Sequence, residues 1–263
     1  MKKYLYIVKM QTMSNLQYVL NTVIGFIGYF IMLFILFSVW KYLYSDPNEL
    51  INGYNMKQMT WYVIITEFLW MTLGGRRLCS EISSEVKSGG ITYKINKPYN
   101  YILYCLFNHI GNNALKGIVC FILSMGTGYL FLRWFPNINI ISLLIVILTC
   151  ILAFTISTLL ITFIGLFSFY IEDSGPFYWV YSKIILVLGT LFPIEYFPHF
   201  IQGFLKYSPV YVVSYGPAKL FVDFSYNKAI SIIIAQIIYI IISYSICYLI
   251  YKKGVKRINV NGG

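Results

Sequence analysis

The chain has 263 residues, of which 59% are hydrophobic and only 11% charged, whereas a soluble globular domain carries roughly 25% charged residues. With a mean hydropathy of +0.70 it cannot bury its apolar side chains in one core and keep a charged surface, so an integral membrane protein is predicted. The net charge of +11 comes from basic residues that flank apolar runs, which favours membrane lipid over nucleic acid as the partner.

The apolar runs predict an all-α polytopic membrane protein with six transmembrane helices. Each run approaches the ~20 residues that a helix needs to cross the bilayer core. The segment 2–17, which mixes lysines with apolar residues, is predicted to be an amphipathic helix on the inner leaflet. The predicted spans are 18–40, 58–75, 101–132, 140–170, 177–194 and 229–251.

The distribution of basic residues predicts the orientation. With the N-terminus inside, thirteen of the 20 Lys and Arg residues fall in inner segments and six in outer ones. Inner loops of membrane proteins carry the excess of basic residues. Both termini are therefore expected on the cytoplasmic side. The abundance of Ile, Lys, Asn and Tyr suggests an A+T-rich bacterial genome, so the expected membrane is a bacterial cytoplasmic membrane.

The segment 79–98 is the most charged part of the chain and falls on the predicted inner side. Glu81 and Glu85 are four residues apart on one helix face, and Ile82 and Val86 share a neighbouring face. The sequence Ser-Gly-Gly, which includes Gly89, is predicted to end this short helix. The segment is either an ordinary interfacial loop or a rigid projection that a soluble partner can bind.

Polar residues within the predicted spans are candidates for a translocation path, because polar groups inside a membrane are costly. Glu67 is an acid within the second span. It is expected to pair with Lys116 or His109 of the third span. The alternative is that the third helix extends into the cytoplasm and that its polar half is solvated. The polar residues of that half are Asn108, His109, Asn112 and Lys116.

Prolines interrupt the apolar segment 195–224. A proline inside a helix removes a hydrogen bond and clashes with the preceding turn. The segment is therefore predicted to form short re-entrant helices that dip in from the outer face. The helix breakers are Pro193, Pro198, Pro209 and Pro217.

Sequence signatures of enzymes are missing from this chain. It has no Walker A sequence, no H-E-x-x-H and no G-x-S-x-G, and its histidines, His109 and His199, are far apart. No catalytic residue, metal site or cofactor of its own is therefore expected.

Two segments resemble type-2 ABC exporter permeases (the ABC-2 type), in a branch long catalogued only as a membrane domain of unknown function. The first, EISSEVKSGGITYKINKPYNYILYCLFNHIG, follows the second predicted span, and the second, LFPIEYFPHFIQGFLKYSPVYVVSYGPAKLF, precedes the last. Phe200 stands where relatives commonly have Trp. The matching residues are Ile82, Val86, Gly89, Ile91, Lys97, Pro98 and Asn100 in the first, and Pro193, Ile194, Phe197, Pro198, Pro209 and Pro217 in the second.

The resemblance implies a permease subunit that lacks its own ATPase. Two such subunits, alike or from paired genes, would form a membrane dimer driven by two cytoplasmic ABC ATPase subunits, which would bind ATP and Mg. It also implies that 79–98 contains the coupling helix. In this interpretation Glu81 and Glu85 face basic groups of the ATPase, and Ile82 and Val86 fill an apolar hollow between its lobes.

The implied function is outward transport of an amphipathic compound, such as a drug, an antibiotic or a peptide-like or lipid-like molecule, by alternating access. A secondary transporter, a membrane enzyme and a membrane immunity protein that binds a toxic peptide without pumping are the alternatives. A neighbouring gene for an ABC ATPase would distinguish the first from the others.

Overall fold

The computed structural model describes residues 2–17, 19–44, 46, 49–171 and 173–261. Its described elements are helices, with a single isolated β-bridge between Ile51 and Tyr54. In chain order they are α1 (Lys2–Leu16), α2 (Val19–Leu43), α3 (Met56–Leu73), α4 (Arg76–Lys87), α5 (Ile91–Ile95), α6 (Tyr101–Leu132), α7 (Ile140–Leu166), η1 (Phe167–Phe169), α8 (Gly175–Ile185), η2 (Leu186–Leu191), η3 (Ile194–Tyr196), α9 (His199–Lys206), η4 (Tyr211–Tyr215), α10 (Gly216–Val222) and α11 (Tyr226–Asn261).

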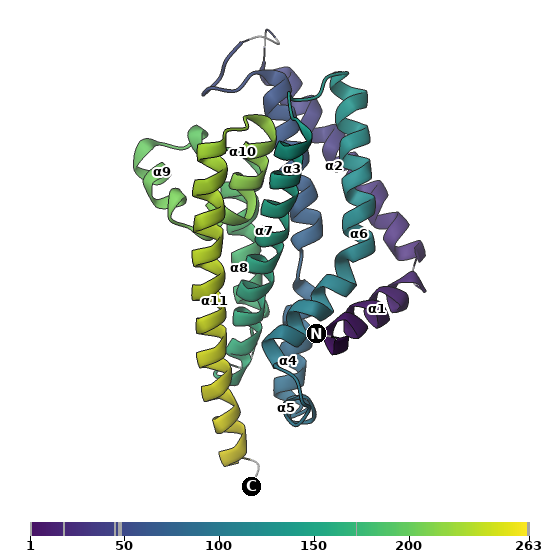
Figure 1. The fold of residues 1–263 in the computed structure, drawn as a ribbon, viewed down its shortest axis with the longest axis vertical. Coiled ribbons are helices and arrows are strands. Elements are labelled where there is room, and N and C mark those ends of the chain that lie inside the picture. The colour runs from purple at the N-terminus through teal and green to yellow at the C-terminus, as the bar shows by residue number, and fades with distance from the viewer. Residues whose placement is uncertain (1, 18, 45, 47–48, 172, 262–263) are drawn as a thin grey trace.

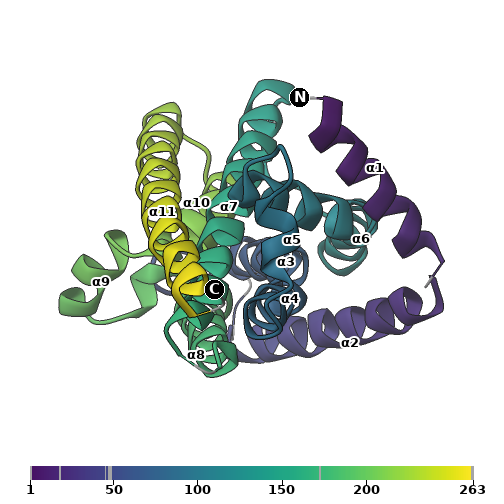
Figure 2. The ribbon, with the colours of Figure 1, turned by 90° about the horizontal axis from the view of Figure 1, so that it is seen from below.

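The long helices form an elongated bundle with different elements at its two ends (Figure 1). The helices α1, α4 and α5 and the C-terminal end of α11 lie in the lower half of this view, whereas α9, α10 and the end of α2 lie in the upper half. Seen from below, α1 and α2 lie on one side of the bundle and α9 and α11 on the other (Figure 2). Both ends of the chain thus share the half of the molecule that contains α4 and α5.

Four of the described helices are long and apolar enough to cross a membrane, so the chain is a multi-pass membrane protein. The predicted spans 58–75 and 177–194 correspond to α3 and to α8 with η2, which do not reach this length and apolarity. The α3 helix carries Glu67, and α8 ends after 11 residues. The count of six spans therefore remains a prediction. The four candidate spans are Ile24–Leu43, Tyr101–Leu132, Ile140–Phe169 and Tyr226–Arg257.

The α3 helix lies inside the bundle, where it packs against α2, α6, α10 and η2. It starts in a capping box, in which the Asn55 side chain accepts a hydrogen bond from the Gln58 N–H at 2.9 Å and the Gln58 side chain accepts one from the Asn55 N–H at 3.1 Å. Trp61 and Tyr62 are completely buried. This burial makes α3 the centre of the main apolar core.

The helix that begins as α8 widens into a π-helical turn over Leu186–Leu191. A π turn leaves backbone carbonyls without their usual helical partners. Two hydroxyls of α3 are the hydrogen-bond donors to these carbonyls. Tyr62 donates to the Gly189 carbonyl at 2.7 Å, and Thr66 donates to the Thr190 carbonyl at 2.8 Å. Ser214 of η4 donates to the same Gly189 carbonyl at 3.0 Å.

The N-terminal segment forms the predicted helix, α1, and packs along α6. The Gln11 amide donates to Asn112 Oδ1 at 2.7 Å, and the Asn15 amide donates to the Asn112 carbonyl at 3.1 Å. The Tyr4 ring stacks on Phe107 with the ring centroids 5.1 Å apart. At Gly111 the two backbones approach so closely that a Cβ atom there would lie 2.8 Å from the Val8 carbonyl oxygen.

We therefore expect Gly111→Ala to release α1. Overpacking of this kind costs roughly 1–3 kcal/mol, which exceeds the ~1 kcal/mol that alanine gains over glycine in a helix. Trypsin should cleave after Lys9, which is exposed, faster in this variant than in the parent protein. Gly126→Ala is the matched control on the same helix, because a Cβ atom at Gly126 meets nothing within 4 Å. Equal cleavage rates in both variants would contradict the close packing of α1 on α6.

Candidate functional site

The helix α4 is amphipathic, and its apolar face packs on the chain's own helices. Ile82 is only 1% exposed and lies against α7 at Gly165, where an added Cβ would lie 3.0 Å from Ile82 Cβ. Val86 is half-buried against the same apolar cluster. The expectation that Ile82 fills a hollow in a partner is therefore wrong, because α7 covers this side chain. Val86 is partly covered by the same cluster, so it too is not free to fill a hollow in a partner completely.

The two acids of this segment are engaged within the chain. Glu81 pairs with Arg77 of its own helix at 2.7 Å. Glu85 pairs with Lys94 of α5 and accepts a hydrogen bond from the Tyr101 hydroxyl at 3.0 Å. Burial alone would lower the pKa of Lys94, but the contacts of Lys94 with Glu85 and Tyr104 together outweigh burial and raise that pKa. Glu85 thus fastens α5 to α4 rather than projecting toward a partner.

A tight turn at Gly89 joins α4 to α5. Gly89 has a φ of +71°, a left-handed conformation that favours glycine. After this turn Ile91 is buried and Tyr93 is 78% exposed. We refer to the exposed or partly exposed side chains of Arg77 and Glu81 on α4 and of Tyr93 on α5 together as the tip surface.

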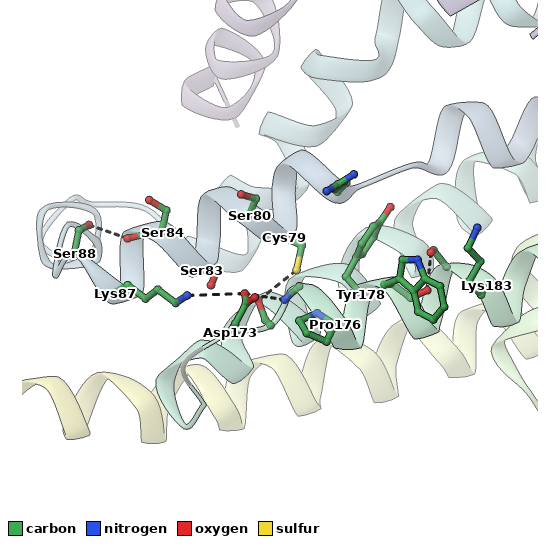
Figure 3. A pocket seen from close by; sticks show the side chains of 15 residues that line it. Cys79, Ser80, Ser83, Ser84, Lys87, Ser88, Asp173, Pro176, Tyr178 and Lys183 are labelled. Atoms are coloured by element: carbon green, nitrogen blue, oxygen red, sulfur yellow. Dashed lines mark hydrogen bonds and ion pairs between the residues drawn. The ribbon is translucent and has the colours of Figure 1, made fainter. Parts of the chain in front are cut away.

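A pocket of about 990 Å³ lies between α4 and the start of α8 (Figure 3). Lys87 of α4 faces Asp173 across it, with Lys87 Nζ 3.9 Å from Asp173 Oδ1. None of the three tip-surface residues lines this pocket. Its lining residues are Arg76, Cys79, Ser80, Ser83, Ser84, Lys87, Ser88, Asp173, Ser174, Gly175, Pro176, Tyr178, Trp179, Ser182 and Lys183.

The polar residues predicted along a path do not form one continuous wall. Glu67 is 3% exposed, and its Oε1 atom has no hydrogen-bond partner among the described residues. The expected pair of Glu67 with Lys116 or His109 is absent from the described ion pairs. Lys116 instead lines a separate cavity of about 240 Å³, together with Trp70 and Tyr181.

The rest of the polar half of α6 packs within the protein. His109 stacks on Phe154 of α7 at 5.1 Å between centroids and contacts the Asn113 amide. Asn108 is buried, and Asn112 binds α1. The polar half is thus covered by neighbouring helices rather than solvated. The contact between α1 and α6 was not predicted from the sequence. The signal for it was the pair Gln11 and Asn15, two amides four residues apart on one face of α1.

The segment 195–224 forms η3, α9, η4 and α10 instead of one continuous helix. Pro193 and Pro198 directly precede η3 and α9. Pro209 precedes η4, a π-helical turn that ends immediately before α10, where Pro217 lies in the first turn. The position of these helices relative to a membrane remains a prediction.

A largely buried polar cluster ties these short helices to the bridge at Tyr54, and we call it the outer cluster after the side of the membrane on which the sequence predicts it. Glu195 accepts hydrogen bonds from Tyr215 at 2.7 Å and Tyr54 at 3.2 Å, and Lys219 Nζ lies 3.1 Å from its carboxylate. Lys219 also donates to the Tyr54 hydroxyl at 2.9 Å. Burial, followed by the effect of Tyr215 and Glu195, raises the pKa of Tyr54, so this phenol stays protonated. Sequence reasoning missed the cluster, although Glu195 and Lys219 are charges in an apolar segment.

Replacing Lys219 by methionine is expected to destabilise the half of the molecule that contains the outer cluster by about 1–3 kcal/mol, since the Lys219 side chain is only 14% exposed and its loss leaves Glu195 without a cation. Lys228→Met is the matched control, because the Lys228–Asp223 pair is largely exposed and such pairs contribute under about 1 kcal/mol. Denaturant unfolding of the purified variants measures the difference. Equal losses of stability would argue against a structural role for the outer cluster.

The comparisons with known proteins agree with this architecture. The model of a family described as "ABC-2 family transporter protein" matches residues 13–262, which is almost the whole chain. The search of curated proteins found no match. Among the described residues, no group of three or more His, Cys, Asp or Glu side chains could hold a metal ion.

Proposed function

The chain belongs to the ABC-2 transporter family, and on this premise we propose that it is the permease subunit of an ATP-driven exporter. Family membership implies a membrane subunit that works with an ABC ATPase, which favours this proposal over a secondary transporter or a non-pumping immunity protein. The ATPase subunits, two in number, bind ATP and Mg and contact the permease from the cytoplasm. A second permease subunit, identical or from a paired gene, completes the membrane dimer in a bacterial cytoplasmic membrane.

The observation that best supports this proposal is the packing of α4 against α7. Ile82 locks α4 against α7, one of the four candidate spans, while Arg77 and Glu81 remain on the outside. A force applied to α4 therefore reaches the membrane helices through packed side chains. Such an element can couple nucleotide-driven motion of a partner to the spans.

We assign the contact with the ATPase to the tip surface. Glu81 keeps its predicted role there, with Arg77 and Tyr93 added. Ile82, Val86 and Glu85 act indirectly in this proposal, because they hold α4 and α5 in place. The turn at Gly89 sets the direction of α5 relative to α4.

Tyr93→Ala should weaken binding of the ATPase about thirtyfold, since truncating a buried interface anchor typically costs about 2 kcal/mol. Co-purification of the partner ABC ATPase with tagged permease measures the effect. Tyr42→Ala is the matched control, because Tyr42 is 87% exposed and lies at the end of α2, in the other half of the molecule. If Tyr93→Ala retained full ATPase binding and transport, the tip surface would not be the coupling contact.

In this proposal the transported compound crosses the membrane along the bundle, from the half that contains the tip surface to the half that contains the outer cluster. Lys116 and Glu67 are candidates for the inner part of the path, because each is polar within the bundle and neither forms an ion pair among the described residues. The outer helices over 195–224 cap the path from the outside. The aromatic content of the chain, 25 Tyr and 20 Phe, suits a bulky amphipathic compound better than an ion.

Site-directed labelling tests the proposed orientation. In a variant whose five cysteines are replaced, single cysteines at Asn137 and Lys206 should react with an impermeant maleimide in intact cells. A cysteine at Lys87 should react only after the cells are opened. All three positions are exposed, so differences report the side of the membrane. Labelling of position 87 in intact cells would show that the chain has the opposite orientation, and it would refute a cytoplasmic coupling segment.

A further inference from the structure

The cavity of about 240 Å³ that Lys116 lines contains a cation and no acid. It lies between the C-terminal end of α3, the second half of α7, the helix formed by α8 and η2, and the turn η4, and Lys116 lines it from α6. Within the described part of the chain, no Asp or Glu and no other Lys or Arg is among its lining residues. The cavity therefore has a positive charge that its own wall does not balance.

Lys116 has no counter-ion among the described residues. Its ammonium neither forms an ion pair nor donates a hydrogen bond within that part of the chain. The residue is nevertheless only partly exposed, and it lies within the candidate span Tyr101–Leu132. A charge inside a membrane bundle pairs with another group, because burial of an unpaired charge is costly. An unpaired lysine at the wall of a cavity thus indicates a ligand with a negative charge.

The remaining wall of this cavity combines aromatic rings with hydroxyl groups. Trp70, Tyr178 and Tyr181 supply the rings. The Tyr181 hydroxyl lies 3.4 Å from Ser157 Oγ, and the Tyr178 hydroxyl accepts a hydrogen bond from the Gly75 N–H at 3.1 Å. A concave wall of apolar and aromatic surface with a few polar groups is typical of small-molecule sites. The wall therefore suits an organic molecule with an apolar body.

We propose that this cavity binds the acidic group of the transported compound, a carboxylate or sulfonate on an aromatic body, with Lys116 as the counter-ion. An inorganic anion would pair with Lys116 but would leave the aromatic wall uncovered, so an amphipathic organic acid fits the cavity better. The link to transport rests on the proposed function, whereas the binding itself needs only this chain. Binding is therefore measured on the permease alone, without the ATPase.

Fluorescence titration of the purified permease in phosphatidylcholine nanodiscs tests this site. The probes are anilinonaphthalene sulfonate and phenylnaphthylamine, which share one ring system and differ in the sulfonate. Above the signal of empty nanodiscs, the sulfonate should bind saturably and about tenfold more tightly than the neutral amine. Lys116→Met should remove this preference, and Lys116→Arg should retain it. Lys183→Met is the matched control, because it removes the same charge from an exposed residue of α8 that does not line the cavity.

Thermal unfolding of the same variants separates loss of binding from loss of the fold. Lys116→Met removes an unpaired charge, so without probe it should unfold at or above the temperature of the parent protein. The sulfonate should stabilise the parent and Lys183→Met but not Lys116→Met.

Four outcomes would overturn the proposal. They are equal binding of the two probes, a preference for the sulfonate that persists in Lys116→Met, a lower stability of Lys116→Met without probe, and displacement of the sulfonate by an equal concentration of inorganic sulfate. The third would show that Lys116 has a structural partner, and the fourth would assign the cavity to an inorganic anion. None of them bears on the assignment of the chain as a permease, which co-purification of the ATPase tests separately.

Discussion

Backbone groups that leave the regular helical pattern must find partners inside the protein, because a bilayer offers none. The π turn over Leu186–Leu191 creates this requirement at Gly189 and Thr190. The hydroxyls of Tyr62, Thr66 and Ser214 donate hydrogen bonds to these two carbonyls. The elements α3, η2 and η4 therefore share one set of hydrogen bonds. Loss of these hydrogen bonds would remove the side-chain partners of two buried carbonyls, those of Gly189 and Thr190, and the packing of η2 and η4 on α3 depends on them.

The helix α3 consequently links the two ends of the molecule. Near its start, the ring of Tyr62 packs against Tyr54 of the outer cluster at 6.1 Å between centroids. At its other end, Gly75 joins it to α4 in a confined place, where an added Cβ would lie 2.5 Å from Ile161 and where the Gly75 N–H donates to the Tyr178 hydroxyl at 3.1 Å. Packed contacts thus run from α4 to the helix whose first half lies beside the outer cluster.

The sequence was sufficient for features that depend on local patterns. The run that follows Lys97-Pro98, polar in its first half and apolar from Gly117, predicted a helix over 101–132, and α6 has these bounds. Prolines predicted the broken segment 195–224. The burial of Ile82 could not be predicted, because an amphipathic helix shows the same pattern whether its apolar face meets a partner or its own chain. The outer cluster joins Tyr54 to Glu195 across 141 positions, a distance that no local pattern encodes.

The contact between α1 and α6 also sets the order of events during biosynthesis. The hydrogen bonds of this contact join residues 96–101 positions apart. Ribosomes add about 5–20 residues per second, so α1 leaves the ribosome roughly 5–20 s before its partner exists. During that interval the lysines and apolar side chains of α1 have only the membrane surface or a chaperone to bind. The amides of Gln11 and Asn15 are uncharged, so these two side chains can later bind α6 without giving up an ion pair with lipid.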